Sequence, residues 1–209
     1  MDTARTTDIR QGVRIEIITI AWMVIEMALS IGAGIAAGSI LLTAFGLDSL
    51  IELVSGGILL WRLQVENRQG DFERVAAGAE RRAAWIVAGT LALLCIYVLV
   101  SAVYGLLVHA KPESSILGIG VSAAAVLVMP YLAVTKRRIA RRIHSDALSG
   151  DAANSITCAY MAGAVLVGLV LNSLFGWWWA EYVAALLFLV WLLRETLEAF
   201  EEARSGPDE

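Results

Sequence analysis

The 209-residue chain is poor in charge and poor in cysteine. Only 17% of its residues are charged, 58% are hydrophobic, and its mean hydropathy is +0.71. This composition excludes an ordinary soluble domain and is typical of an integral membrane protein. Both cysteines, Cys95 and Cys158, fall in apolar stretches, and no CxxC pair occurs. We therefore expect neither a structural disulfide nor a cysteine-rich zinc site.

Long apolar runs account for most of the chain, and a bilayer-spanning helix needs about 20 such residues. We expect an all-α integral membrane protein, a six-transmembrane-helix bundle with no soluble C-terminal domain. The predicted spans are 15–35, 39–63, 82–108, 114–136, 152–174 and 178–199. Because the start of the chain is polar, we expect no cleaved signal peptide. The predicted units are a cytoplasmic tail (1–14), the six-helix domain (15–200) and a short cytoplasmic tail (201–209).

Basic residues predict the orientation, because positively charged loops stay in the cytoplasm. Every Lys and Arg except Lys111 falls before span one, between spans two and three, between spans four and five, or at the end of span six. We expect both termini on the cytoplasmic side of an inner or plasma membrane. "KRRIARRIH" (136–144) is interpreted as a topology determinant on a solvated loop, which is compatible with binding anionic lipid headgroups. Trp177–Trp179 is interpreted as an interfacial anchor on the outer side.

Small residues recur in "SIGAGIAAGS" (30–39) and in "SGG" (55–57). In a bilayer such residues let helices come close together. We interpret both stretches as packing seams, with a possible hinge at Gly56 and Gly57.

Two acids interrupt the apolar stretch "FGLDSLIELVSGGILLWRL" (45–63). A charge near the bilayer centre costs about 2.5–3.5 kcal/mol on insertion scales. Asp48 and Glu52 are spaced i, i+4, so on a helix they differ by roughly 40° and about 6 Å of rise. Two such carboxylates repel unless they are protonated or bound to a cation, and a divalent metal ion resolves both problems. The alternative is a structural pair hydrogen-bonded to a neighbouring helix.

Span five carries a second polar stripe in "GDAANSITCAY" (150–160). Asp151, Asn154, Ser155 and Cys158 lie at i, i+3, i+4 and i+7, which is one face of a helix. Carboxylate, amide oxygen and thiolate are possible metal donors, and carboxylate with thiolate suits zinc better than magnesium or calcium. If the two stripes face each other, they form one intramembrane metal site.

Each residue of that stripe has a plainer interpretation. Asp151 lies near the predicted start of span five and is equally a helix N-cap. Asn154 is equally a helix-to-helix hydrogen-bonding residue. Cys158 alone is more often a small buried hydrophobic residue.

Glu26 lies midway along the first span, where a carboxylate is a functional candidate by default. It is interpreted as a proton relay, as a residue that tunes the site, or as the partner of a polar residue such as Ser101 or Asn172. Glu16 is expected at the cytoplasmic interface with no special role, and His144 in a solvated loop.

Three stretches together resemble the cation diffusion facilitator family. "AGSILLTAFGLDSLIELVSG" (37–56) resembles its first loop and second helix, "SGDAANSITCAYMAGAVLVGL" (149–169) its fifth helix, and "GWWWAEYVAALLFLVWLLRETLEAF" (176–200) its sixth. Asp48 and Glu52 fall at the two ligand positions of the second helix. The form of the second helix is closest to the short branch that includes transmembrane protein 163.

The resemblance implies a homodimer that moves zinc or a related divalent cation out of the cytoplasm in exchange for protons. Its site would take two ligands from the second helix and two from the fifth. Here Asn154 and Cys158 stand at the positions usually held by His and Asp. The His-rich loop between helices four and five is absent, and the chain ends about ten residues after its last predicted span.

Two functions follow as hypotheses, with Zn²⁺ as substrate and no resident cofactor. The first is a proton-coupled efflux transporter whose site opens alternately to either side of the bilayer. The second is a membrane zinc sensor, buffer or accessory subunit that binds without transport. An enzyme is not expected, because no nucleophile–base pair accompanies the acids. No nucleic-acid partner is expected either.

Overall fold

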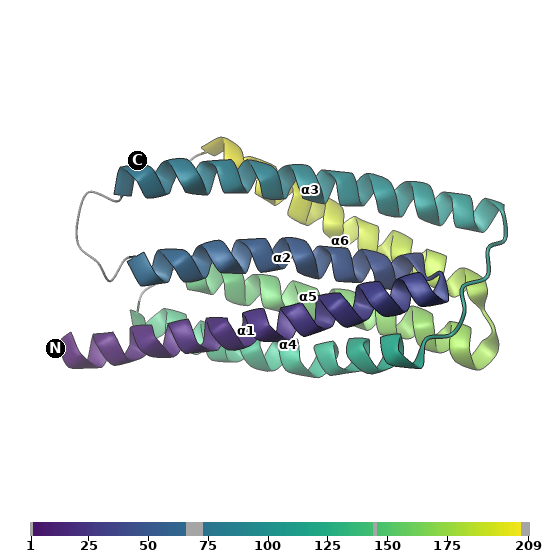
Figure 1. Cartoon of the computed structure of the whole chain (residues 1–209), viewed down its shortest axis with the longest axis horizontal. Helices are drawn as coiled ribbons and strands as arrows, with labels where there is room; N and C mark the ends of the chain where they lie inside the picture. The colour runs from purple at the N-terminus through teal and green to yellow at the C-terminus, as the bar shows by residue number, and fades with distance from the viewer. Residues whose placement is uncertain (1, 66–72, 144–145, 206–209) are drawn as a thin grey trace.

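The computed structural model describes residues 2–65, 73–143 and 146–205. Over these ranges the chain forms six helices that run side by side along one long axis (Figure 1). The helices are α1 (Asp2–Ala37), α2 (Ile40–Val65), α3 (Glu73–Leu107), α4 (Ile116–Ile143), α5 (Asp146–Phe175) and α6 (Trp178–Ser205). The all-helical, six-helix architecture expected from the sequence is confirmed. The prediction made for His144 lies outside the described residues.

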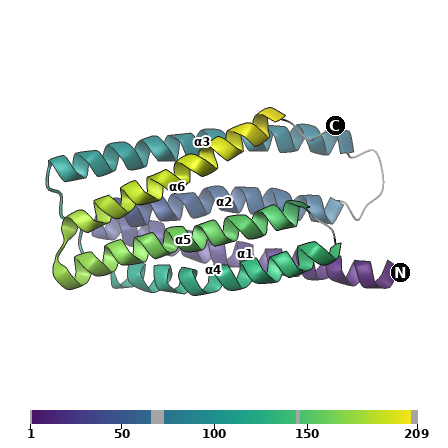
Figure 2. The ribbon, with the colours of Figure 1, turned by 180° about the vertical axis from the view of Figure 1, so that it is seen from behind.

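Five of these helices contain a segment long and apolar enough to cross a bilayer. The segments are Arg10–Ala37, Ile40–Ile58, Ala88–Leu107, Ile116–Arg142 and Asp151–Phe175. α6 differs because Glu181 and Arg194 confine its uninterrupted apolar run to 182–193, well short of the about 20 residues a span needs. α6 nevertheless packs against α3 and α5 along the bundle (Figure 2).

Several helices extend beyond their predicted spans. α1 already begins at Asp2, so the segment predicted as an N-terminal tail continues the first helix. α4 runs on to Ile143, which makes the stretch 136–143 helical, and the solvated loop predicted there is wrong. No glycine or proline interrupts that stretch, so the helical hydrogen bonds continue beyond the apolar part.

Glycine and serine mark the helix ends. Gly38 and Gly176 have positive φ values of 63° and 64° and follow the last residues of α1 and α5, as C-terminal caps do. Ser39 caps α2, since its hydroxyl accepts a 3.3 Å hydrogen bond from the Leu42 N–H. Ser115 caps α4 in the same way, accepting a 3.0 Å bond from the Gly118 N–H.

α1 and α2 form a close antiparallel pair through glycine. A Cβ added at Gly34 would lie 2.6 Å from the Thr43 backbone nitrogen, and one at Gly46 would lie 2.8 Å from the Ile31 nitrogen. The packing seam predicted over 30–39 is therefore confirmed at Gly34.

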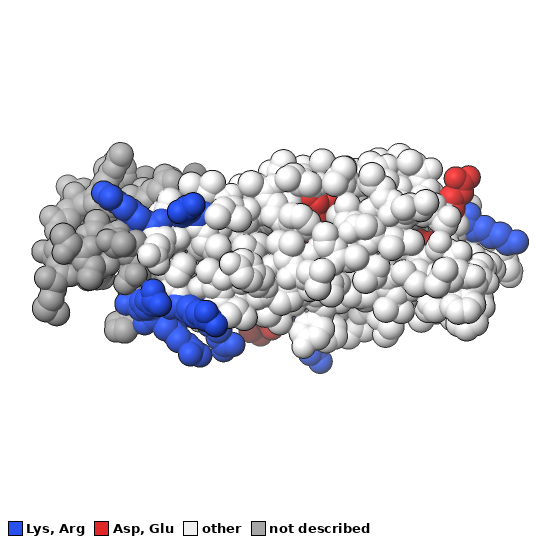
Figure 3. Space-filling view, turned by 90° about the horizontal axis from the view of Figure 1, so that it is seen from below, with Lys and Arg blue, Asp and Glu red and all other residues white. Residues whose placement is uncertain are grey.

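The outer surface of the bundle is largely apolar and carries its basic residues mainly at one end (Figure 3). Those exposed on the helix ends there are Arg10, Arg14, Arg137, Arg138, Arg141 and Arg142. Trp177 and Trp179 stand at the opposite end, both 44% exposed and stacked with ring centres 5.5 Å apart. An apolar belt between a basic end and an aromatic end suits a protein embedded in a bilayer.

Candidate functional site

Asp48 is a buried carboxyl group that lacks a hydrogen-bond partner. Its side chain is 1% exposed, and neither carboxyl oxygen has a hydrogen bond to any described residue. Three further acids act on it electrostatically, namely Glu52 on the next turn of α2, Glu195 on α6 and Glu26 on α1. A buried carboxylate among other acids is unfavourable unless a proton or a cation compensates it.

Glu52 lies one helical turn beyond Asp48 and faces α5. It is 8% exposed, and its Oε1 accepts a 3.0 Å hydrogen bond from the side-chain nitrogen of Asn154. The polar stripe of α2 and that of α5 therefore meet at this pair, in the interior of the bundle.

Cys158 and Glu26 add a third helix to the same cluster. The Cys158 thiol, 1% exposed, lies 3.9 Å from Oε1 of Glu26. Glu26 also accepts 2.7 Å hydrogen bonds from the Ser49 hydroxyl and the Trp22 indole N–H. The sequence interpretation named Ser101 and Asn172 as possible partners of Glu26, and this was wrong. α1 turns Glu26 toward α2 and α5, so its partners are Trp22, Ser49 and Cys158.

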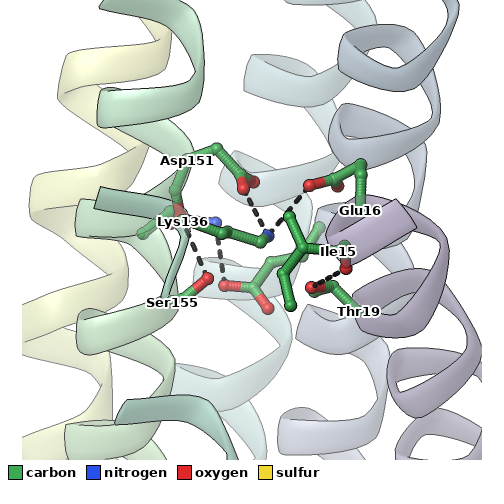
Figure 4. Close-up of polar contacts among 8 residues, drawn as sticks. Ile15, Glu16, Thr19, Lys136, Asp151 and Ser155 are labelled. Atoms are coloured by element: carbon green, nitrogen blue, oxygen red, sulfur yellow. Dashed lines mark hydrogen bonds and ion pairs between the residues drawn. The ribbon is translucent and has the colours of Figure 1, made fainter. Parts of the chain in front are cut away.

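Asp151 lies apart from this cluster, toward the basic end of the bundle. It pairs with the ammonium of Lys136, which in turn lies 3.1 Å from Oε2 of Glu16 (Figure 4). The N-cap interpretation of Asp151 is wrong, because α5 begins five residues earlier at Asp146. Lys136 and Glu16 are both 0% exposed, so neither occupies the loop or interface position expected for it.

A separate polar network lies at the opposite end of the bundle. Glu181 on α6, 2% exposed, accepts a 2.5 Å hydrogen bond from Ser39 and a 2.7 Å bond from the Asn172 amide. The Asn172 amide also donates to the Pro112 carbonyl at 3.1 Å. This network ties α2, α5, α6 and the α3–α4 connection together.

The sequence interpretation did not place four of these groups, namely Glu16, Lys136, Glu181 and Glu195, in the polar clusters of the bundle. Glu195 was overlooked because it stands at the charged end of α6, and Glu16 and Lys136 because they border the predicted spans. Glu181 had one available signal, since it is an isolated acid within "GWWWAEYVAALL".

The cluster of Asp48, Glu52, Asn154, Cys158 and Glu26 offers carboxyl, amide and thiol donors from three helices. In the part of the chain that the structure describes, no three His, Cys, Asp or Glu side chains are close enough together to hold a metal ion as they stand. Chemically, the cluster can release protons and become a cation-binding group if its side chains turn toward a common centre.

Comparison with known proteins places the chain in a family. Residues 17–206 match the family described as the cation efflux transmembrane domain. That family comprises transporters, so the chain is not assigned to an enzyme class.

Two named proteins are similar to this chain. The chain is 26% identical over 200 residues to the uncharacterized transporter sll1263 of Synechocystis sp., covering 91% of this chain and 64% of that protein. It is 27% identical over 86 residues to the cation-efflux pump FieF of Shewanella oneidensis, covering 41% of this chain and 29% of that protein. The chain thus spans less than two thirds of the length of either relative. Since the family match extends over nearly the whole chain, this protein belongs to the cation efflux transmembrane domain family.

Proposed function

We propose that this protein moves a divalent cation, with zinc as the first candidate, out of the cytoplasm in exchange for protons. The proposed binding groups are Asp48 and Glu52 of α2 together with Asn154 and Cys158 of α5. Glu26 is proposed to tune the cluster or to relay protons. The similarity of α2 to the branch that includes transmembrane protein 163 stays a prediction.

The burial of Asp48 carries this proposal. Its two carboxyl oxygens lack hydrogen-bond partners among the described residues, although the side chain is almost completely buried. A group that costs about 2.5–3.5 kcal/mol to insert needs a compensating ligand in at least one working state. A divalent cation supplies that compensation, and protons supply it when the cation is absent.

Exchange of protons for metal then needs no separate pathway. Metal ligands must be deprotonated, so cation binding releases protons from the same carboxyl groups that later take them up. The spacing between the groups supports a cycle in which side chains close around the ion and open again. We place the basic end of the bundle in the cytoplasm, because Arg and Lys favour that side.

Zinc flux into sealed vesicles tests this function. The purified protein is reconstituted, a pH gradient is imposed, and zinc uptake is compared between wild type and Asp48→Ala. We expect gradient-dependent uptake in wild type and its loss in the variant, with unchanged insertion into the vesicles. Wild-type uptake by the Asp48→Ala variant would place the site elsewhere and overturn the assignment.

The same experiment separates transport from binding. Stoichiometric zinc binding without flux would assign the protein as a membrane zinc sensor, buffer or accessory subunit. A proposed homodimer is measured separately, from the mass of the purified protein with its detergent subtracted. A monomer that transports zinc would remove the dimer from the proposal and leave the site intact.

A further inference from the structure

A buried ammonium joins three helices next to the proposed cation site. Lys136 of α4 is 0% exposed, and its Nζ pairs with the carboxylates of Glu16 on α1 and Asp151 on α5 (Figure 4). Glu16 is also fully buried, while Asp151 is 19% exposed. One cation is thus shared by two acids, which leaves the trio with one excess negative charge when all three are ionised.

The trio lies directly beside the pair formed by Glu52 and Asn154. Asp151 precedes Asn154 by three residues on α5, about 4.5 Å along the helix axis. On α2, Gly56 follows Glu52 by four residues, and a Cβ added at Gly56 would come within 3.0 Å of Oε1 of Glu16. Both helices therefore place the trio one turn from the Glu52–Asn154 pair, toward the basic end of the bundle.

Stability alone is a poor reason for this arrangement. Desolvating a buried ion pair costs about as much as the pair regains, and well-packed apolar side chains often stabilise equally well. A lysine does offer a compact charge on a long flexible stem, which can swing without moving the helix that carries it. Arg137 and Arg138, on the next two positions of α4, are exposed, so the surface of the bundle lies within reach of such a swing.

We propose that Lys136 is a latch that closes the cytoplasmic side of the cation path. With Lys136 in place, α1 and α5 are tied together below Glu52 and Asn154. An approaching divalent cation is attracted by the excess negative charge and competes for the two carboxylates. When Lys136 swings away, α1 and α5 separate and the path to Glu52 opens. The role of the latch in transport rests on the proposed function, whereas the closure itself does not.

Access to Ser155 reports on this closure. Ser155 is 6% exposed and follows Asp151 by four residues, so it lies on the same face of α5, and its hydroxyl donates a 3.1 Å hydrogen bond to the Asp151 carbonyl. The test uses Ser155→Cys in a chain whose native thiols are removed by Cys95→Ser and Cys158→Ser. Alkylation by N-ethylmaleimide is followed in inverted vesicles and in detergent.

Lys136→Met should raise the alkylation rate by about tenfold or more, because local opening becomes easier once the ionic tie is lost. Glu16→Gln, which leaves Lys136 with Asp151, should raise it less. Arg137→Met is the matched control, since it removes an exposed charge from the same turn of α4, and it should leave the rate unchanged. If Lys136→Met proves too unstable to purify, the alkylation rate of Glu16→Gln is compared with that of Arg137→Met. A faster rate in Glu16→Gln supports the latch, and equal rates reject it.

Equal alkylation rates in the Ser155→Cys background and in its three variants would overturn the latch. Equal acceleration by Arg137→Met would overturn it too, because the effect would then be one of surface charge. Alkylation is measured without zinc, both in vesicles and in detergent. The alkylation test can therefore reject the latch while the flux test supports zinc transport. Conversely, if the wild-type protein shows no zinc flux while Lys136→Met still raises the alkylation rate of Ser155→Cys in the background without native thiols, the proposed function is rejected and the closure is kept.

Discussion

Asn154 of α5 donates a 3.0 Å hydrogen bond to the carboxyl of Glu52 on α2. This contact fixes the rotation of α5 about its axis, because the same face then presents Cys158 to Glu26 one turn further along. It also uses one N–H of the Asn154 amide and leaves the amide oxygen available as a ligand. The polar residues of two helices far apart in the sequence are thereby brought together.

Replacing the amide of Asn154 by a carboxylate should lower the stability of the metal-free protein and raise its affinity for a cation. Asn154→Asp removes the donor and sets a second acid against Glu52, so we expect the metal-free protein to lose about 1–3 kcal/mol. Added zinc should restore more stability to this variant than to wild type, since it gains a charged ligand. Thermal unfolding in detergent with and without zinc measures both effects. Asn154→Leu is the control, because it loses the hydrogen bond without gaining a ligand; equal rescue of both variants would contradict the prediction.

Asp48 and Glu26 should respond in opposite ways to neutralisation. Asp48→Asn replaces a buried ionisable group that has no hydrogen-bond partner by a neutral group of similar size, so the variant should be at least as stable as wild type while losing zinc binding. Glu26→Gln sets an amide against the donors Ser49 and Trp22 and should cost about 1–3 kcal/mol. Chemical denaturation compares the two. A loss of stability in Asp48→Asn as large as that in Glu26→Gln would show that Asp48 is a structural residue.

The helices could be predicted because backbone polar groups inside a bilayer must be satisfied within each segment. Apolar runs therefore locate the helices directly, and the glycine seam of 30–39 follows from side-chain size. The positions of polar residues at the helix ends were harder to predict, because α1 and α4 continue as helices beyond their apolar parts. The basic stretch of α4 was interpreted as a loop for that reason.

Periodicity also has a limit in the site. It shows that Asp48 and Glu52 share one face of a helix, but not which helix that face meets. Packing decides this rotation, and packing places Glu26 against Cys158. The pairing of Glu16 with Lys136 joins residues 120 positions apart, and neither position differs locally from an ordinary interfacial charge.

The two serine caps provide a matched pair for the network around Glu181. Ser115→Ala removes only the cap of α4 and should cost about 1 kcal/mol of unfolding free energy. Ser39→Ala removes the cap of α2 and also the 2.5 Å bond to the Glu181 carboxyl. Because hydrogen bonds to charged groups contribute about 1.5–3 kcal/mol, its cost should exceed that of Ser115→Ala by a similar amount. The free energy of unfolding of both serine variants is measured by denaturation, first in the wild-type background and then in the Glu181→Gln background. Equal costs of Ser39→Ala and Ser115→Ala in the wild-type background would contradict the prediction.

The glycines of α1 test the close packing against α2. A Cβ at Gly34 would meet the backbone nitrogen of Thr43 at 2.6 Å, so α1 and α2 must move apart to admit Gly34→Ala. Gly32, two residues earlier, has nothing within 4 Å of such a Cβ. Gly34→Ala should therefore destabilise the protein by about 1–3 kcal/mol through overpacking. Gly32→Ala should be neutral or stabilise it by about 0.5–1 kcal/mol through helix propensity.

Zinc binding extends the same comparison to the site. Gly34 contacts Thr43, and Glu26 contacts Ser49, on the same pair of helices, α1 and α2. Moving these helices apart should therefore also move Glu26 away from Cys158. We expect weaker zinc binding in Gly34→Ala and unchanged binding in Gly32→Ala, as measured by titration calorimetry. If Gly34→Ala lost stability and kept full zinc affinity, the cluster would be set by α2 and α5 alone, and Glu26 would have no part in tuning it.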